Sequence, residues 1–243
     1  MNRNNSKIVL VTGACGGIGK SIVIKYAQQG KTLAIADKDE EQSLKLAHEI
    51  QQNGGQAVSF SGDLLDKGYC DNLANEVQKK LGSIDILINN AGTTGPMGVP
   101  GAMGYQKIDS MDYQIWRDIL EVNLLSPFKI ATAFHDHVAR SDKKILIMMS
   151  SDLGSVEQNN FGGFYSYRAS KSALNIISKG MSVDWNDVTV IALAPGWCKT
   201  YLGGDEAEIE PAESVEQQQE MFEGIAAKDS GKFLDRFGKE VAW

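Results

Sequence analysis

Tyr167 and Lys171 lie four residues apart in the polar run 165–171. Residues i and i+4 of a helix share one face, so this spacing predicts a phenol and an ammonium side by side. Tyrosine has a pKa near 10, and a close cation that favours the phenolate would move that pKa toward neutral pH. The pair therefore predicts an acid/base device, although a half-buried aromatic ring beside a solvated lysine is the plainer explanation of the same spacing.

A glycine-rich segment near the N-terminus favours the chemical interpretation of that pair. The apolar run 9–12 leads into several glycines, and an amphipathic segment then continues to Gln29. This order predicts a strand, a turn and a helix, with backbone amides that can approach a pyrophosphate at the helix N-terminus. The residues expected at the pyrophosphate are Gly13, Gly17, Ile18 and Gly19.

A carboxylate follows at the distance that a dinucleotide site requires. The second apolar strand, residues 33–36, ends at Asp37, about twenty residues beyond the glycines. A carboxylate at this point can accept hydrogen bonds from both hydroxyls of an adenosine ribose. The alternative is that Asp37 only caps the helix expected to start near Asp39.

These elements together resemble the classical short-chain dehydrogenase/reductase family, and further motifs follow in that family's order along nearly the whole chain. Most of them stand where an apolar strand ends, which is where ligands bind in open parallel sheets. Asn123 instead matches an asparagine that kinks a long helix in this family. The motifs are Asp63, Asn89-Asn90-Ala91-Gly92, Asn123, Ser150-Ser151 and Pro195-Gly196-Trp197-Cys198-Lys199-Thr200.

Within that family the chain resembles the C-factor and sniffer-like branch, which includes carbonyl reductases and proteins implicated in signalling. The resemblance rests on the glycine pair 162–163, the run 167–175 and the closing segment 238–243. Ser151 lies sixteen residues before Tyr167, whereas many classical members have thirteen, and this branch tolerates the longer spacing. Because the Ser-x-x-Gly pattern starts from it, Ser151 is the expected catalytic serine and Ser150 is the alternative.

The resemblance implies a role for each matched residue. Asn123 would hold a water of the proton relay, and Ser151 would hydrogen-bond the reacting oxygen. Tyr167 would exchange a proton with that oxygen, while Lys171 would bind the nicotinamide ribose and favour the phenolate. The implied cofactor contacts are Gly13, Gly17, Ile18, Gly19, Asp37, Asp63, Asn90, Ala91, Gly92, Tyr167, Lys171, Pro195, Gly196 and Thr200. Met97, Phe164, Trp197 and Tyr201 are candidate walls of the substrate pocket, with core or interface packing as the alternative for each.

The expected cofactor is NAD, favoured over NADP because Asp37 would repel the extra phosphate. Gly16 occupies a position where NADP-preferring relatives often have a basic residue. Lys38, next to Asp37, keeps NADP open as the alternative.

Strand and helix signals alternate, which predicts a single α/β domain over residues 1–243. The expected fold is a Rossmann-type, doubly wound parallel sheet of about seven strands with helices on both faces. Two segments, 93–109 and 201–223, interrupt the alternation and are candidate substrate loops. Helices near 112–138 and 165–185 are the pair that this family uses for dimer packing, so a homodimer or homotetramer is expected.

Composition narrows the function classes. The 243 residues carry 24 basic against 31 acidic groups, a net charge of −7 that disfavours nucleic acid as a partner. The polar N-terminus and the lack of a long apolar stretch predict a cytoplasmic protein that makes no membrane contact. Three widely spaced cysteines suggest neither disulfides nor a metal site.

The sequence therefore predicts an oxidoreductase that transfers hydride between a nicotinamide cofactor and a small to medium, mainly apolar alcohol or carbonyl substrate. Two alternatives remain. One is a catalytically idle, dinucleotide-binding signalling protein of the C-factor type, and the other is a dehydratase or epimerase on the same scaffold.

Overall fold

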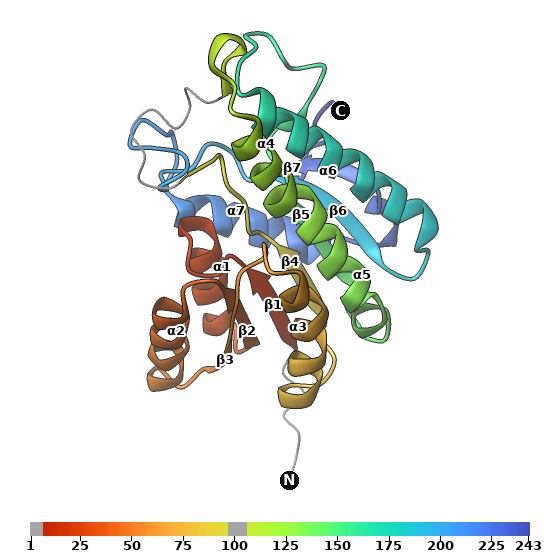
Figure 1. The fold of residues 1–243 in the computed structure, drawn as a ribbon. Coiled ribbons are helices and arrows are strands. Elements are labelled where there is room, and N and C mark those ends of the chain that lie inside the picture. Colours follow the sequence, from red (N-terminus) through yellow and green to blue (C-terminus); the bar gives the residue numbers. More distant parts are fainter. Residues whose placement is uncertain (1–6, 97–105) are drawn as a thin grey trace.

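A parallel sheet of seven strands, in the order β3-β2-β1-β4-β5-β6-β7, forms the centre of the protein (Figure 1). The structure is a computed structural model that describes residues 7–96 and 106–243. The strands are β1 (Ile8–Thr12), β2 (Thr32–Asp37), β3 (Gln56–Ser61), β4 (Ile86–Asn89), β5 (Ile145–Met149), β6 (Thr189–Ala194) and β7 (Lys232–Asp235). This strand order confirms the predicted doubly wound α/β fold. The sequence could predict it because long apolar runs bounded by polar turns are typical of buried parallel strands.

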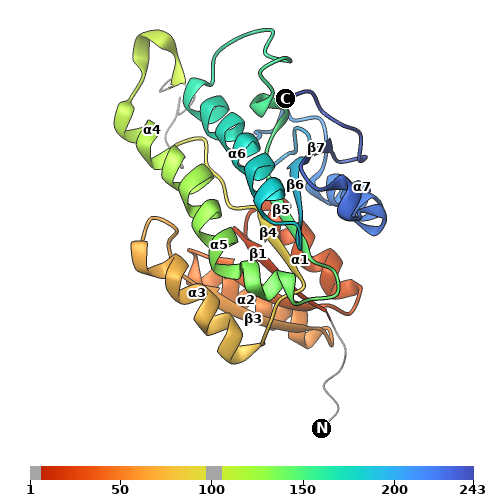
Figure 2. The ribbon, with the colours of Figure 1, turned by 90° about the vertical axis from the view of Figure 1, so that its right-hand side faces the viewer.

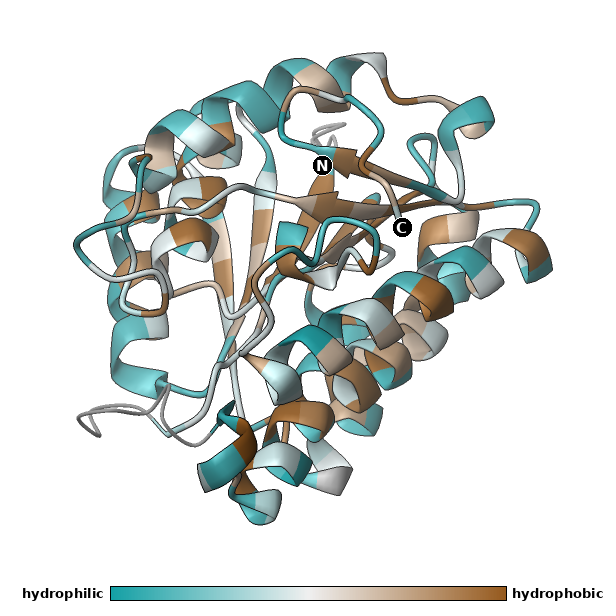
Figure 3. Ribbon diagram, turned by 90° about the horizontal axis from the view of Figure 1, so that it is seen from above, coloured by the Kyte–Doolittle hydropathy of each residue, from teal (hydrophilic) through white to brown (hydrophobic). Residues whose placement is uncertain are grey.

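Helices cover both faces of this sheet (Figures 1 and 2). On one face lie α1 (Gly17–Gln28), α2 (Glu40–Gln52) and α7 (Pro211–Gly224). On the other lie α3 (Lys67–Lys80), α5 (Ser126–Ala139) and α6 (Tyr165–Asp184), with α4 (Tyr113–Leu120) preceding α5. Successive side chains of a strand point to opposite faces of the sheet. Val9 and Val11 therefore pack toward α1, whereas Leu10 packs toward α3 and α5. Figure 3 shows the resulting apolar strands between helices that turn polar residues outward.

The sheet changes winding direction between β1 and β4. β1 pairs with β2 on one side and with β4 on the other, so successive strands are added first toward one edge and then toward the opposite edge. The C-terminal ends of β1 and β4 therefore lie side by side where the strand order reverses, which is the place where ligands bind in open parallel sheets. The loops that follow β5 and β6 end at the same edge, which brings the predicted motifs together.

Two predicted segments differ from the structure. The expected long helix 112–138 is divided into α4, one turn of π-helix at Glu121–Leu125, and α5, with Asn123 inside the π turn. The expected loop 201–223 is a loop only in its first half, since α7 occupies Pro211–Gly224. Of the other candidate loop, 93–109, residues 97–105 lie outside the described ranges. Within the described ranges, no helix combines the length and apolar character needed to cross a membrane.

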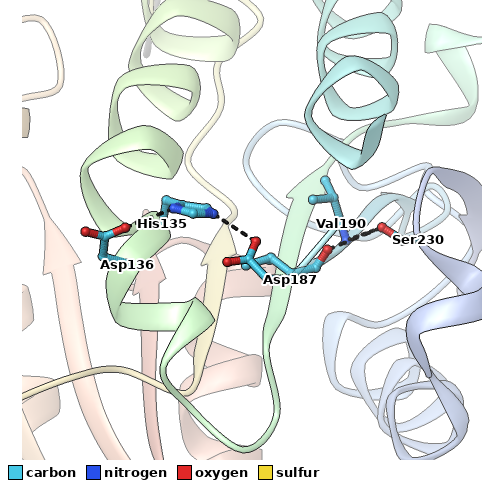
Figure 4. Close-up of polar contacts among 6 residues, drawn as sticks. His135, Asp136, Asp187, Val190 and Ser230 are labelled. Atoms are coloured by element: carbon cyan, nitrogen blue, oxygen red, sulfur yellow. Dashed lines mark hydrogen bonds and ion pairs between the residues drawn. The ribbon is translucent and has the colours of Figure 1, made fainter. Parts of the chain in front are cut away.

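An imidazole connects α5 to the turn before β6. His135 Nδ1 lies 3.1 Å from Asp136 Oδ1, and His135 Nε2 lies 3.1 Å from Asp187 Oδ1 (Figure 4). Nearby, the Val190 amide donates a 3.1 Å hydrogen bond to the Ser230 hydroxyl, which joins β6 to the segment before β7. These contacts lie at the N-terminal end of β6, opposite the strand ends that carry the predicted motifs.

Candidate active site

Three of the predicted catalytic side chains meet where β5 ends against the first turns of α6. Lys171 Nζ lies 5.7 Å from the centroid of the Tyr167 ring, as the helical spacing predicts. Ser151 lies two residues beyond β5, close enough to the Tyr167 phenol for its hydroxyl to act toward a lower pKa of that phenol. Lys171 is almost completely buried, and its ammonium donates a 2.8 Å hydrogen bond to the Met149 carbonyl.

Burial shifts the pKa of both titrating groups. It raises the pKa of the Tyr167 phenol to about 12, against a lowering by the hydrogen bond with Ser151 and a further raising by the Asp152 charge. It lowers the pKa of the Lys171 ammonium to about 8. The prediction that the protein's own cation lowers the tyrosine pKa was therefore wrong, because loss of hydration outweighs the hydrogen bond and the lysine is bonded to a backbone carbonyl instead.

The two adjacent serines have different surroundings. The Ser150 hydroxyl is buried and donates a 2.6 Å hydrogen bond to Asn175 Oδ1. Its proton is therefore used inside the protein. The Ser151 hydroxyl faces Tyr167 and accepts a 3.2 Å hydrogen bond from the Leu153 amide. Of the two, Ser151 is the serine whose hydroxyl can share a substrate oxygen with the phenol.

The segment that lengthens the Ser151–Tyr167 spacing is anchored by the end of the chain. The backbone oxygen of Trp243 accepts hydrogen bonds of 3.1 Å from the amides of both Val156 and Glu157. The Trp243 ring packs against Phe233 with 5.7 Å between the ring centroids. The closing segment that suggested the sniffer-like branch thus supports the longer connection between Ser151 and Tyr167.

Asn123 is buried in the π turn and is bonded on both sides of its amide. Its Oδ1 accepts from the Thr93 amide at 2.8 Å, and its Nδ2 donates to the Thr93 carbonyl at 2.9 Å and to Ser170 Oγ at 3.0 Å. Ser170 Oγ in turn donates to the Tyr167 carbonyl at 2.7 Å. Asn123 therefore connects the loop after β4 to the backbone of the tyrosine. Ser170 was not singled out from the sequence, although it stands inside the Tyr-x-x-x-Lys motif.

The glycine-rich turn after β1 forms a backbone cradle at the start of α1. Gly13 has φ +61°, and a Cβ there would lie 2.8 Å from Ala91 Cα. A Cβ at Gly19 would lie 2.1 Å from the Gly13 carbonyl oxygen, so only glycine allows the helix to pack this closely. α1 begins next to Gly16, which has no side chain to cap it, so the first amides, including that of Ile18, can serve an anion. These residues fit a dinucleotide pyrophosphate.

Asp37 lies at the end of β2 beside this cradle. Its Oδ2 accepts a 2.8 Å hydrogen bond from the Cys15 amide, and its Oδ1 accepts a 3.1 Å bond from the Asp39 amide. The side chain that caps α2 is Asp39, which accepts from the Gln42 amide. Asp63 is exposed one residue beyond Gly62, whose amide donates to the Asp37 carbonyl at 3.0 Å. Both carboxylates therefore follow the C-terminal ends of neighbouring strands, β2 and β3, and their contact with an adenosine stays a prediction.

The turn after β4 is joined directly to β1. Thr12 Oγ1 accepts hydrogen bonds of 3.1 Å from the amides of both Asn90 and Ala91. Asn90 Nδ2 donates to the Thr12 and Gly13 carbonyls at 3.0 and 3.1 Å. A Cβ on Gly92 would lie 3.5 Å from Lys171 Nζ, so this turn connects the cradle to Lys171. Thr12 was missed from the sequence, since a threonine that ends a strand carries no distinctive signal.

The loop after β6 closes the other side of the cradle. A Cβ on Gly17 would lie 2.5 Å from Thr200 Cγ2, which places Thr200 against the glycine-rich turn. Gly196 has φ +82° and turns the chain after Pro195, whose carbonyl accepts a 2.6 Å hydrogen bond from Ser214 of α7. Pro195 is thereby held by α7, the helix that the sequence did not predict.

The candidate pocket residues have different surroundings. Trp197 is half exposed, and its Nε1 donates a 2.8 Å hydrogen bond to the Gly203 carbonyl within the same loop. Tyr201 is exposed, and Phe164 adopts a left-handed backbone with φ +51° at the residue before α6. Met97 lies outside the described ranges. Trp197 and Tyr201 follow β6, so two of the four side chains come from the loop that also carries Thr200.

A model of the short chain dehydrogenase family matches residues 7–210, which include the cradle, the serine, the tyrosine and the lysine. The chain belongs to the short chain dehydrogenase family. It is 33% identical to the C-signal protein of Myxococcus xanthus over 165 residues, which are 67% of this chain and 94% of that protein.

Two solved structures extend the likeness over nearly the full length. The carbonyl reductase Sniffer of D. melanogaster superposes with a TM-score of 0.85 at 27% identity, covering 98% of this chain and 100% of that one. An NADPH-bound carbonyl reductase from chicken fatty liver superposes with a TM-score of 0.85 at 25% identity, covering 99% and 100%. A nicotinamide dinucleotide is thus the family's cofactor type, and the resemblance to the C-factor and sniffer-like branch is confirmed.

Proposed function

We propose that this protein is an NAD-linked oxidoreductase that interconverts an alcohol and a carbonyl in a small to medium, mainly apolar substrate. The observation that carries the proposal is the placement of the Tyr167 phenol between the Ser151 hydroxyl and the buried Lys171, whose Nζ lies 5.7 Å from the centroid of the tyrosine ring. These groups can hold one substrate oxygen and move one proton to or from it. Bound at the glycine cradle, the dinucleotide supplies or accepts the hydride.

Four side chains of the protein bind the substrate oxygen, move the proton and hold the cofactor and the site in place. The Ser151 hydroxyl donates a hydrogen bond to the substrate oxygen and stabilises the charge that develops there. The Tyr167 phenol gives that oxygen a proton in reduction and takes one in oxidation. Lys171 binds the nicotinamide ribose through its ammonium, and Asn123 holds the turn after β4 against the catalytic helix.

The choice of NAD over NADP rests on Asp37. Its carboxylate lies next to the Cys15 amide in the cradle, where a 2′-phosphate would be repelled. Gly16 supplies no cation to offset that repulsion, and Lys38 is the nearest basic residue in the sequence. The carbonyl reductase from chicken fatty liver holds NADPH, so NADP is the rival that binding measurements must exclude.

A signalling role without turnover is the second candidate, and the likeness to C-signal favours it. Against it stands the complete set of Asn123, Ser151, Tyr167 and Lys171 in one connected cluster. A protein that only binds a dinucleotide has no physical need for a phenol with a serine partner at the substrate position.

A substrate screen tests the proposed function. The purified protein is mixed with NADH or NADPH and a panel of aldehydes and ketones, and with NAD or NADP and secondary alcohols, while nicotinamide absorbance is followed. We expect turnover of apolar members of the panel with NADH and NAD. Tight dinucleotide binding without turnover of any member would favour the signalling role.

A further inference from the structure

The first turn of α6 takes a hydrogen-bond acceptor from a distant part of the chain. Gln106 lies 61 residues before Tyr167, and its Oε1 accepts a 3.0 Å hydrogen bond from the Tyr167 amide. The same oxygen accepts a 2.9 Å bond from the Ser166 hydroxyl. Phe164, the residue before the helix, has a left-handed backbone and no side-chain hydrogen bond to cap it. Gln106 therefore does for α6 what an N-cap residue does for other helices.

The other end of the Gln106 amide is fixed as well. Its Nε2 donates a 2.7 Å hydrogen bond to the Thr94 carbonyl, and the side chain is fully buried. Thr93, the preceding residue, exchanges two hydrogen bonds with Asn123. Both glutamine and asparagine are thus anchored at the same point, directly after the Asn90-Ala91-Gly92 turn.

The two anchors act on the two backbone hydrogen-bonding groups of one residue, Tyr167. Gln106 binds the Tyr167 amide, while Asn123 holds Ser170 Oγ, which donates to the Tyr167 carbonyl at 2.7 Å. Glutamine is suited to this place because its uncharged amide offers an acceptor to the helix and a donor to Thr94 at once. A side chain that lacks the acceptor would leave a buried amide without a partner and free the tyrosine backbone to shift.

We propose that Gln106 is a positioning residue for the proton transfer at Tyr167, a proposal that rests on the function proposed above. By holding the Tyr167 amide against the loop after β4, Gln106 fixes the phenol relative to Ser151. Displacement of a catalytic group by about 1 Å can lower turnover a hundredfold, so loss of this hold should affect kcat more than dinucleotide binding.

Three variants test the proposal. Q106M keeps the volume of the side chain and removes both hydrogen-bonding groups, whereas Q106E keeps the acceptor oxygen. Q114M is the matched control, because Gln114 is an exposed residue of α4 that contacts Asp118. We expect Q106M to lower kcat about ten- to hundredfold while the dinucleotide KM changes less than about twofold. Q106E can give the Thr94 carbonyl a donor only in its protonated form, so its kcat relative to the wild type should rise as pH falls, and Q114M should match the wild type.

Amide hydrogen exchange supplies a readout that does not depend on turnover. Peptides covering residues 165–171 should exchange faster in Q106M than in the wild type, and peptides of β6 should not. An unchanged kcat in Q106M or an unchanged exchange rate at 165–171 would each overturn the proposal. If the wild type turns over no substrate, the proposed function fails, and the exchange measurement alone then decides whether Gln106 holds the tyrosine backbone.

Discussion

Lys171 places a positive charge in the protein interior, where its ammonium has lost most of its hydration and donates a hydrogen bond to the Met149 carbonyl. Burial lowers the pKa of its ammonium from 10.5 to about 8. Below pH 8 the lysine is charged in both the folded and the unfolded chain, so the folded state bears the full desolvation cost. The cost falls as pH rises from about 8 toward 10.5, because the folded state then releases its proton first.

Replacing Lys171 by methionine should therefore stabilise the fold while it abolishes function. At pH 7 we expect the free energy of unfolding to rise by about 1–3 kcal/mol, with the gain shrinking above pH 8. Urea unfolding of Lys171→Met and the wild type at pH 7 and pH 10 measures this. Turnover and dinucleotide affinity should both fall. A variant that is less stable at pH 7 would show that the ammonium contributes more to the fold than its burial costs.

Asp37 should decide the selectivity between NAD and NADP. Asp37→Ala removes a carboxylate that can bond the ribose and repel a 2′-phosphate, so NAD affinity should fall and NADP affinity should rise. We expect the preference to narrow by about 1–3 kcal/mol, the range for a charge-assisted hydrogen bond. Dissociation constants for both dinucleotides measure the change.

Gly16→Arg, added to Asp37→Ala, supplies the missing cation and should shift the preference further toward NADP. The arginine can be accommodated, since a Cβ at Gly16 would meet only the Gly13 carbonyl oxygen, at 3.4 Å. Tighter binding of NADP than of NAD by the unmutated protein would show that Lys38, or another group, outweighs Asp37.

At the scale of elements, the sequence predicted what is locally encoded. The sequence predicted about seven strands, and the two apolar runs whose bounds it gave, 9–12 and 33–36, match β1 and β2 within one residue at each end, because each run ends in a polar or glycine-containing turn. α7 was missed because its buried face is partly polar. Ser214, Gln218 and Gln219 are buried beside Val215 and Phe222, so the apolar repeat of an amphipathic helix is hidden among glutamates. Pro211 at its first turn was the available signal.

Contacts between distant segments could not be predicted from local patterns. The family resemblance supplied Asn123 and Ser151 as catalytic candidates. Gln106 and Thr12 act through bonds to residues that are 61 and 78 positions away, and their neighbours in sequence give no sign of these partners. The direction of the Tyr167 pKa shift likewise depends on burial, which only the assembled fold determines.

Asn123 makes the π turn a structural as well as a functional element. Asn123→Ala would leave the buried amide and carbonyl of Thr93 without their side-chain partners. We expect it to lower the free energy of unfolding by about 2–4 kcal/mol, since each unpaired group costs about 1–3 kcal/mol. Asn53→Ala, at the exposed end of α2, is the control and should cost less than about 1 kcal/mol. Equal losses in urea unfolding would contradict a special role for the π turn.

For the whole molecule, the outer layer formed by α5 and α6 exposes large apolar side chains. Ile176 and Val183 are 73% and 71% exposed and lie seven residues apart on α6, and Leu125 and Phe128 are also exposed near the start of α5. This surface is the part of the described fold that best suits the predicted homo-oligomer.

Ile176→Asp together with Val183→Asp should convert the protein to monomers. Two carboxylates at the centre of an apolar interface would lose their hydration without gaining partners. Mass from light scattering at several concentrations measures the result, and Leu44→Asp, which alters an exposed leucine on α2, should leave the mass unchanged. A wild-type protein that is monomeric at all concentrations would refute the predicted oligomer.

The proposed mechanism requires the phenolic oxygen of Tyr167 to transfer the proton. The kcat of Tyr167→Phe at saturating substrate therefore tests the proposed function most directly. The ring would still pack, and only the proton-transferring group is lost; we expect kcat to fall about 10²- to 10⁴-fold with the NAD dissociation constant within about threefold of the wild type. Tyr165→Phe, two residues earlier on the same helix, is the matched control and should retain wild-type turnover. If Tyr167→Phe keeps more than about a tenth of wild-type turnover, Tyr167 is not the proton donor and the proposed mechanism is wrong.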